Sequence, residues 1–349
     1  MKITKQVLVK NVKIGGGAPI SVQSMTTTKT SDVESTVAQI DALEKAGCDI
    51  VRVAIADERD AVAVKEVVSK IRLPLVADIH FSPKLAVTAI ENGADKVRIN
   101  PGNIGGEKEI KYVADCVKAH AIPVRVGANT GSIEKRFLEK YGKNEYSLVE
   151  SALYNVGILE KYGVQDVVIS VKASSVPLTV KAYQLLAQKT DYPLHLGVTE
   201  AGTTEAGVIK SAIGIGSLLV NGIGDTIRVS LTDNPVKEVE AGRLILRGCG
   251  LDEEYVEVVS CPTCGRCEWD SMALAEKVSA FVKPYKKKLK LAVMGCVVNG
   301  PGEAKDAELG IAGGKGSCLL FKQGEPYKKV DAKDAEREFF KEIRLLLDE

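Results

Sequence analysis

The chain has 349 residues, which is long enough for one large domain and a smaller one. Its 47 Lys and Arg residues against 46 Asp and Glu leave a net charge of +1, so no overall field recruits nucleic acid or an anionic membrane, and we expect neither as a partner. The longest apolar stretch, "AIGIGSLLVNGIG", is too short and too rich in glycine to cross a bilayer, and "MKITKQVLVK" lacks the apolar core of a signal peptide, which predicts a cytoplasmic protein.

Short β-branched runs alternate with helical stretches through the first 235 residues. Buried strands that alternate with helices form a parallel sheet, and eight such units in about 220 residues match a (β/α)₈ TIM barrel. A doubly wound open sheet is the alternative. The earlier segment "QVLVKNVKIGGG" predicts a hairpin on the N-terminal face of the barrel. The predicted strands are "PISVQS", "DIVRVA", "LPLVADIH", "KVRIN", "PVRVGA", "DVVISVKA", "PLHLGVT" and "TIRVSLT".

Polar residues gather at the carboxyl ends of these strands, where a barrel places its active site. An unpaired charge inside a barrel is costly, and the available acids, chiefly Asp78 and Glu200, are too few to neutralise every cation by pairing. The surplus predicts a multiply anionic ligand such as a diphosphate, for which the glycine-rich turn of "RINPGNIGG" offers backbone N–H groups. The strand-end cations are Arg52, Arg98, Arg125, Lys172 and Arg228.

The last third of the chain has a different pattern. A strand "EYVEVVS" leads into Cys261, and a helix "MALAEKVSAFVKPY", a strand "LKLAVMGC", a glycine-rich stretch and an amphipathic helix "DAEREFFKEIRLLL" follow. We therefore expect a barrel domain over residues 1–247, a linker over 248–257 and a compact α+β domain over 258–349.

Five of the eight cysteines lie in this last part of the chain, three of them in "CPTCGRC" at 261–267. Tetrahedral zinc, an iron–sulfur cluster and a redox dithiol all remain open on the spacing alone. The other three, Cys48, Cys116 and Cys249, stand in apolar or helical contexts and are interpreted as packing residues.

Seven segments in order resemble the bacterial two-domain 4-hydroxy-3-methylbut-2-enyl diphosphate synthase family of the methylerythritol phosphate route to isoprenoids. They are "VQSMTTTKT", "VADIHF", "RINPGNIGG", "LHLGVTEAG", "GIGDTIRVSLT", "SCPTCGR" and "MGCVVNGPGEA". The resemblance implies a TIM barrel followed by a domain that resembles half of sulfite reductase. It also implies a [4Fe-4S] cluster held by three cysteines and one glutamate, which match Cys261, Cys264, Cys296 and Glu303.

The resemblance further implies a reductive ring opening and dehydroxylation of 2-C-methyl-D-erythritol 2,4-cyclodiphosphate. Two electrons arrive singly from flavodoxin or ferredoxin, and the carboxylate ligand Glu303 is exchangeable for a substrate oxygen. Glu200 is the candidate proton donor for the departing hydroxyl, with simple neutralisation of a cation as the alternative. The implied substrate-binding residues are Arg52, His80, Arg98, Asn100, Arg125, Asn129, Lys172, Thr199, Arg228 and Ser230.

Two thiols lie outside the family motif. Cys267 completes a Cys-x2-Cys-x2-Cys run and competes with Cys296 as a possible ligand, and Cys318 is the other extra thiol. The basic run "KPYKKKLK" is interpreted as a solvated helix end, with docking of an acidic electron carrier as the alternative.

Chain geometry predicts a head-to-tail homodimer. The last barrel helix returns the chain to the face opposite the active site, so we expect each C-terminal domain to cap the barrel of the other subunit, which agrees with the resemblance. Two rival functions remain, a sugar-phosphate aldolase or isomerase with structural zinc and a non-catalytic iron–sulfur carrier.

Overall fold

The computed structural model describes residues 2–99 and 101–348, which divide into two compact units, Met1–Leu251 and Asp252–Glu349. Each unit is described by itself. The boundaries at 247 and 257 that the sequence suggests stay predictions.

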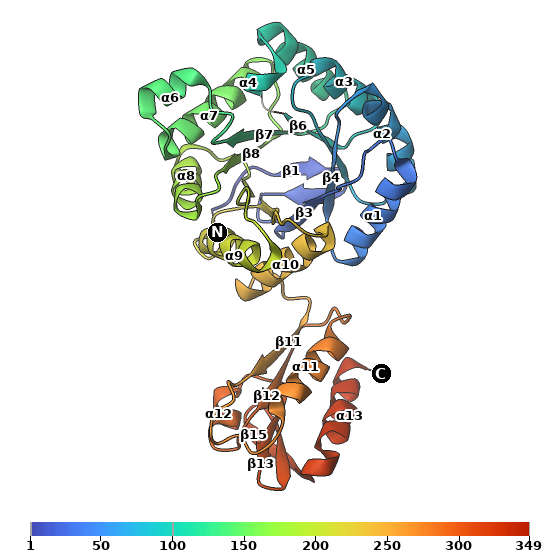
Figure 1. Cartoon of the computed structure of the whole chain (residues 1–349), viewed down its shortest axis with the longest axis vertical. Coiled ribbons are helices and arrows are strands. Elements are labelled where there is room, and N and C mark those ends of the chain that lie inside the picture. Colours follow the sequence, from blue (N-terminus) through green and yellow to red (C-terminus); the bar gives the residue numbers. More distant parts are fainter. Residues whose placement is uncertain (1, 100, 349) are drawn as a thin grey trace. The chain divides into compact units, whose positions relative to one another are not determined.

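The first unit is a closed parallel barrel (Figure 1). Neighbouring strands pair in the order β8-β7-β6-β5-β4-β3-β10-β9, and a bridge between Ile169 and Leu194 joins the two outer strands. This closure confirms the TIM barrel and excludes the open doubly wound sheet. The strands are β3 (Ser21–Met25), β4 (Ile50–Ala54), β5 (Leu75–Asp78), β6 (Lys96–Ile99), β7 (Val124–Asn129), β8 (Val167–Lys172), β9 (His195–Leu196) and β10 (Thr226–Ile227).

Helices surround the barrel as an outer ring (Figure 1). Many begin at a polar cap residue; Asp32, for example, accepts a hydrogen bond from the Ser35 N–H at 3.2 Å. The helices are α1 (Val33–Lys45), α2 (Glu58–Lys70), α3 (Pro83–Glu91), α4 (Pro101–Ile104), α5 (Glu107–Ala119), α6 (Lys135–Tyr141), α7 (Glu145–Lys161), α8 (Val176–Lys189), α9 (Thr204–Leu219) and α10 (Pro235–Gly248).

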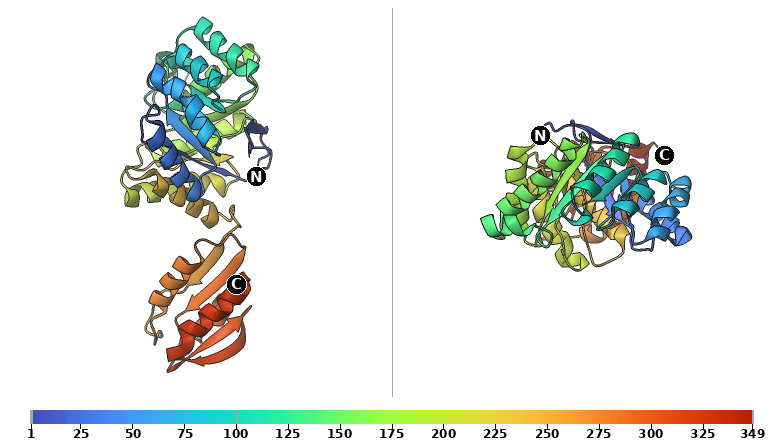
Figure 2. Two further views of the ribbon diagram at one scale, coloured as in Figure 1. Left: turned by 90° about the vertical axis from the view of Figure 1, so that its right-hand side faces the viewer. Right: turned by 90° about the horizontal axis from the view of Figure 1, so that it is seen from above.

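A short hairpin closes the N-terminal end of the barrel. Strands β1 (Val7–Val9) and β2 (Val12–Ile14) pair antiparallel, and the segment lies at the side of the barrel in the left view of Figure 2. Apolar side chains of the hairpin form a small core with side chains at the beginnings of three barrel strands, namely Ile50, Val76 and Val168. The predicted hairpin is therefore present, and it plugs the barrel.

The second unit is a five-stranded mixed sheet with two helices on one face. Helix α11 (Ser271–Val282) and helix α13 (Ala335–Leu347) lie side by side, and the rings of Phe281 and Phe340 meet edge to face at 5.2 Å (Figure 1). Strands β11 to β13 are parallel and β13 to β15 antiparallel. The remaining elements are β11 (Val256–Ser260), β12 (Leu289–Met294), α12 (Gly300–Glu303), β13 (Leu309–Gly314), β14 (Ser317–Lys322), β15 (Glu325–Asp331) and the 3₁₀ turn Ala332–Asp334.

The glycine-rich stretch contains a strand that the sequence pattern conceals. β13 includes Gly310 and Gly313, and glycine ordinarily weakens a strand. Here the ring of Phe321 lies directly over Gly310 and the indole of Trp269 over Gly313, so a Cβ at either position would collide with the ring. The two glycines thus make room for aromatic packing.

Candidate active site

The predicted site residues lie on the inner surface of the barrel. Along β6, for example, Arg98 points inward while Val97 and Ile99 join the core beneath the helices. Side chains alternate along a strand, so this arrangement follows from the sequence period of two. The parallel register places Arg98 between Asp78 and Arg125.

Asp78 is the acidic centre of the inner surface. Its carboxylate lies 3.1 Å from Arg98 Nη1, 3.7 Å from Arg52 Nε and 3.5 Å from His80 Nε2. Burial raises the pKa of the Asp78 carboxyl, but the charges of Arg52 and Arg98 and a hydrogen bond from His80 outweigh it and lower the pKa well below its usual range. Asp78 therefore stays ionised and neutralises part of the cation cluster.

Arg228 has an acidic partner that the sequence did not reveal. Glu238, on α10, accepts hydrogen bonds from Arg228 Nε at 3.2 Å and Nη2 at 3.1 Å. The same carboxylate accepts from the Ser24 hydroxyl and from the backbone N–H of Leu231. Arg228 is thus held at the end of β10 by a buried ion pair.

Arg125 and Lys172 have no carboxylate within ion-pairing distance in the described part of the chain. Both are buried, with exposed fractions of 3% and 7%. Burial, followed by the charges of neighbouring cations, lowers the pKa of each group well below its ordinary value. Gly197 makes room for the Lys172 ammonium, because a Cβ there would lie 2.5 Å from Lys172 Nζ.

Glu200 occupies a turn directly after β9 and is exposed. Its φ angle of 53° is left-handed, a conformation that a non-glycine residue rarely adopts and that is often retained at functional sites. No ion pair joins its carboxylate to a cation among the described residues.

The smaller predicted residues lie around the barrel mouth. Thr199 and Ser230 follow β9 and β10 and are half-buried, Asn129 ends β7, and His80 is exposed beyond β5. Asn100 lies outside the described residues.

The inner surface also holds polar groups outside the predicted substrate-binding set, although the sequence already places His195 among the polar residues of its strand. Lys96 and His195 are both fully buried, and Gln23 is 2% exposed. The polar side-chain atoms of all three have no hydrogen-bond partner. The signal was present in the sequence, since Lys96 and His195 stand two positions before Arg98 and Gly197 on the same face of their strands.

Two neighbouring loops of the second unit carry the predicted cluster ligands. They follow the parallel strands β11 and β12, whose register sets Ser260 beside Val293. The Gly295 N–H donates to Cys261 Sγ at 3.0 Å, which joins the two loops. A Cβ at Gly295 would lie 3.1 Å from Cys267 Sγ and 3.3 Å from Cys261 Sγ, so both sulfurs border this glycine.

Arg266 lies among the other three predicted ligands. Its backbone and side chain hydrogen-bond Cys264 and lower the pKa of that thiol. The pKa of Arg266 is raised first by Cys264 and also by Cys296 and Glu303. All four predicted ligands thus belong to one end of the sheet, although no three His, Cys, Asp or Glu side chains among the described residues stand in a metal-holding arrangement.

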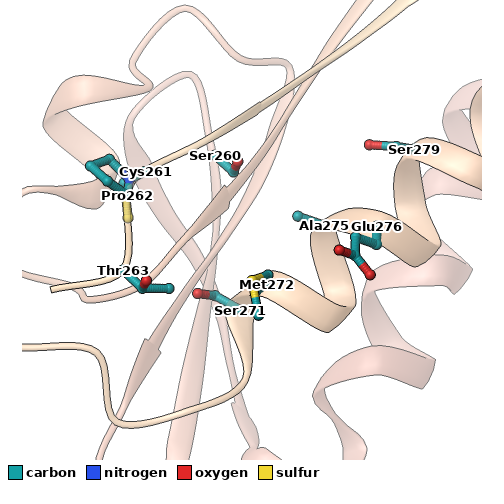
Figure 3. Close-up of a pocket in the computed structure, with 9 residues that line it drawn as sticks. All are labelled: Ser260, Cys261, Pro262, Thr263, Ser271, Met272, Ala275, Glu276 and Ser279. Atoms are coloured by element: carbon teal, nitrogen blue, oxygen red, sulfur yellow. The ribbon is translucent and has the colours of Figure 1, made fainter. Parts of the chain in front are cut away.

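A groove of about 560 Å³ runs beside Cys261 (Figure 3). One wall is the segment from Ser260 to Thr263, and the other is α11 with Met272 and Glu276. Cys318, by contrast, is 1% exposed in the core between the sheet and its helices. Cys48, Cys116 and Cys249 pack in or against the barrel core, as predicted.

The basic run 283–290 forms ion pairs within its own unit. Lys287 pairs with Asp348 at 2.6 Å, Lys288 with Glu253 at 2.6 Å, and Lys290 with Asp306 at 2.8 Å. These pairs favour the solvated helix end over a free docking patch.

Two family models match almost the whole chain. The GcpE TIM-barrel domain matches residues 4–243, and the GcpE protein C-terminal domain matches residues 257–345. A protein of Caldanaerobacter subterraneus subsp. tengcongensis named 4-hydroxy-3-methylbut-2-en-1-yl diphosphate synthase (flavodoxin) is 58% identical over 100% of this chain and 98% of its own length. The chain belongs to this synthase family.

Other relatives with the same name match the chain over nearly its whole length. The Clostridium perfringens synthase is 54% identical over 99% of both chains, and the Fusobacterium nucleatum synthase is 53% identical over 99% of this chain and 97% of its own. Membership of the synthase family makes this chain an enzyme and an oxidoreductase. No described helix is long and apolar enough to cross a membrane.

Solved structures that resemble the chain share its barrel. The Yersinia pestis dihydropteroate synthase has a TM-score of 0.50 and 13% identity over 72% of this synthase-family chain and 100% of its own. An N-acetylneuraminic acid synthetase from Leptospira borgpetersenii also has a TM-score of 0.50 and 13% identity, over 80% of this chain and 98% of its own. At this identity the likeness concerns the fold alone.

Proposed function

We propose that the chain catalyses the reductive ring opening and dehydroxylation of 2-C-methyl-D-erythritol 2,4-cyclodiphosphate to 4-hydroxy-3-methylbut-2-enyl diphosphate. One carbon–oxygen bond to the cyclic diphosphate breaks, and the hydroxyl leaves as water. The dianionic substrate takes up two electrons and one net proton to give the trianionic product. The printed names of the relatives support this reaction and support flavodoxin as the electron donor, with ferredoxin as the alternative carrier.

The observation that carries the proposal is a pair of buried cationic side chains inside the barrel, Arg125 and Lys172, for which the described residues offer no carboxylate within ion-pairing distance. A cyclic diphosphate supplies negative charge beyond that of Asp78 and Glu238. Arginine guanidinium groups suit phosphate oxygens, and Asp78 and Glu238 already orient those of Arg52, Arg98 and Arg228. Ring opening adds negative charge to the diphosphate, so the same cations stabilise the product side of the reaction. Around them we assign His80, Asn100, Asn129, Thr199 and Ser230 to the sugar hydroxyls and phosphate oxygens.

Glu200 is the proposed proton donor for the departing hydroxyl. Its place after β9, on the side of the barrel where the strands end, and its freedom from any ion pair among the described residues support this role. The left-handed backbone conformation of Glu200, with φ 53°, fixes the direction in which its side chain leaves the main chain.

Cys261, Cys264, Cys296 and Glu303 would hold a [4Fe-4S] cluster. The donor set suits iron, since Cys261 and Cys264 follow β11, Cys296 and Glu303 follow β12 with Glu303 in the short helix α12, and the N–H of Gly295 already donates to a sulfur. Bound there, the cluster would deliver electrons one at a time. The carboxylate is a harder and more exchangeable ligand than the thiolates, so Glu303 is the residue that would give way to a substrate oxygen.

We further propose a head-to-tail homodimer with shared active sites. Helix α10 begins beside the mouth, where Glu238 holds Arg228, and its later residue Arg243 binds Gly47 and Asp49 just before β4 begins. The chain therefore leaves the barrel on the face away from the cations. The segment 249–255 between α10 and β11 spans at most ~25 Å when extended, so reaching the partner's mouth is easier than climbing the same barrel.

Anaerobic purification with iron and sulfide analysis, followed by a reduced-flavodoxin assay with the cyclic diphosphate, tests the proposal. We expect a brown protein that consumes the substrate. A colourless zinc protein without this activity would contradict it.

A further inference from the structure

Lys96 is a fully buried lysine inside the barrel, at 0% exposure. It opens β6 and stands two residues before Arg98 on the inner face, about 7 Å deeper along the strand. Its Nζ has no hydrogen-bond partner. The hairpin below packs the apolar side chains Val7, Val9 and Ile14 against the beginnings of the barrel strands.

The groups that face Lys96 are almost all positive or neutral. Asp78 is the acid on the neighbouring strands, and its oxygens lie 3.1 Å from Arg98 and 3.7 Å from Arg52. Lys96 Nζ makes no hydrogen bond to either oxygen. The titratable and charged groups of the surrounding strands are Arg52 of β4, Asp78 and His80 of β5, Arg98 of β6, Arg125 of β7, Lys172 of β8, His195 of β9 and Arg228 beyond β10.

These surroundings decide which group gives up its charge. An arginine keeps its proton in proteins, whereas a lysine in a dry interior loses it readily. Burial lowers the pKa of Lys96 to about 7, with further contributions from Arg125 and Arg52. His195, equally buried, has a pKa far below its ordinary value for the same reason and stays neutral.

We propose that Lys96 is an uncharged amine in the free enzyme and takes up one proton from solvent when a dianion binds to the cation cluster above it. The inference rests on the proposed substrate. Two negative charges placed at the mouth partly cancel the field of Arg52, Arg98 and Arg125, so the ammonium form of Lys96 becomes favourable. The new charge then helps to hold the diphosphate as its ring opens and a further negative charge appears.

Proton uptake is measured directly by calorimetric titration. The enzyme is titrated at pH 8 with the cyclic diphosphate, and separately with sulfate, in buffers of different ionisation enthalpy. Neither ligand titrates near this pH, because both cyclic phosphates are diesters and sulfate is a strong acid anion, so the proton balance reports on the protein. We expect uptake of about one proton per barrel, and an affinity that falls about tenfold per pH unit above neutrality.

Lys96→Met should remove about one proton from the uptake and weaken this pH dependence. His195→Gln is the matched control at the same depth and should retain both, and Lys172→Met measures any proton taken up by the other buried lysine, whose pKa burial also lowers well below its ordinary value. Undiminished uptake in Lys96→Met, or uptake that disappears in His195→Gln alone, would assign the proton to another group and overturn the proposal. If Lys96→Met does not fold, binding to the wild-type enzyme without proton uptake overturns it equally.

The two ligands separate this inference from the proposed function. Binding of sulfate with Lys96-dependent uptake, but no binding of the cyclic diphosphate, would contradict the substrate assignment and leave the linkage between Lys96 and an anion intact. Binding of the cyclic diphosphate without uptake would support the substrate and refute the linkage.

Discussion

Glu238 of α10 receives two hydrogen bonds from the guanidinium of Arg228, at 3.2 and 3.1 Å, although ten positions separate the two residues. The pair ties the last barrel strand to the helix that follows it. Because Glu238 is 3% exposed, its carboxylate depends on the protein for its solvation.

Glu238→Gln should therefore destabilise the barrel by about 3 kcal/mol, since Arg228 loses its counter-charge while remaining partly buried. Chemical denaturation measures the loss. The exposed ion pair of Asp115 with Lys111 provides the control, and Asp115→Asn should cost under about 1 kcal/mol. Equal losses in the two variants would show that the Arg228 pair is not energetically special.

Arg125→Met should weaken binding of the cyclic diphosphate by roughly 100-fold, or about 3 kcal/mol, because a charged hydrogen-bonding fork is lost. The folded protein should be as stable as the wild type or more so, since Arg125 has no acidic partner among the described residues and its removal relieves repulsion. Substrate titration and thermal unfolding measure the two effects.

Arg98→Met is the informative comparison. It should weaken binding similarly but also destabilise the protein, because Asp78 loses its nearest cation at 3.1 Å. In both variants the absorbance of the proposed cluster should stay unchanged. Unaltered substrate affinity in both would refute the cationic pocket.

Lys96→Met should be more stable than the wild type near neutral pH, and the difference should close as the pH rises towards 10. Because the pKa of Lys96 is lowered to about 7 in the folded protein, the unfolded chain binds more protons between that value and the ordinary lysine pKa. Wild-type stability therefore increases with pH across this window, by roughly 3–5 kcal/mol in total. Denaturation of both proteins at neutral and alkaline pH checks the expectation; parallel curves would contradict it.

Cysteine substitutions test the ligand set. Cys261→Ser, Cys264→Ser and Cys296→Ser should each lose the brown absorbance and the iron, because each removes a thiolate ligand. Cys267→Ser should keep its full iron content, since the Cys267 thiol already donates to the Trp269 carbonyl at 3.1 Å and contacts Ser271. A colourless Cys267→Ser protein beside an intact Cys296→Ser protein would reverse the assignment.

Mixing two inactive variants tests the shared active site. Glu200→Gln lacks the proton donor and Cys264→Ser lacks a cluster ligand, so a mixed dimer contains one site with neither defect. Random exchange of subunits should restore activity to about a quarter of the wild-type value. Proven exchange without any recovery would mean that each chain works alone.

The barrel and its inner cations were predictable because strand alternation is a local property. Arg98 and Arg125 face inward for the same reason that Val97 and Val124 face outward, and the alternation of charged and apolar residues is visible in the sequence. Lys96 obeys the same alternation, but it opens β6 and so lies below the strand ends at which a barrel places its active site.

Glu238 was not predictable in this way. It stands on a helix, and only the packing of α10 on β3 and β10 brings its carboxylate to Ser24 and Arg228. β13 was concealed for a related reason, since Gly310 and Gly313 make sense only once Phe321 and Trp269 are placed against them. Both depend on contacts between residues far apart in sequence.

The hairpin at the N-terminal end of the barrel has a consequence for turnover. Val7, Val9 and Ile14 seal that end with apolar contacts, so molecules reach the inner cations only past the carboxyl ends of the strands. Ligands then enter and leave the barrel through the same opening. In the proposed reaction, the diphosphate product must leave the barrel before fresh substrate enters, and the proton proposed for Lys96 must travel by the same route.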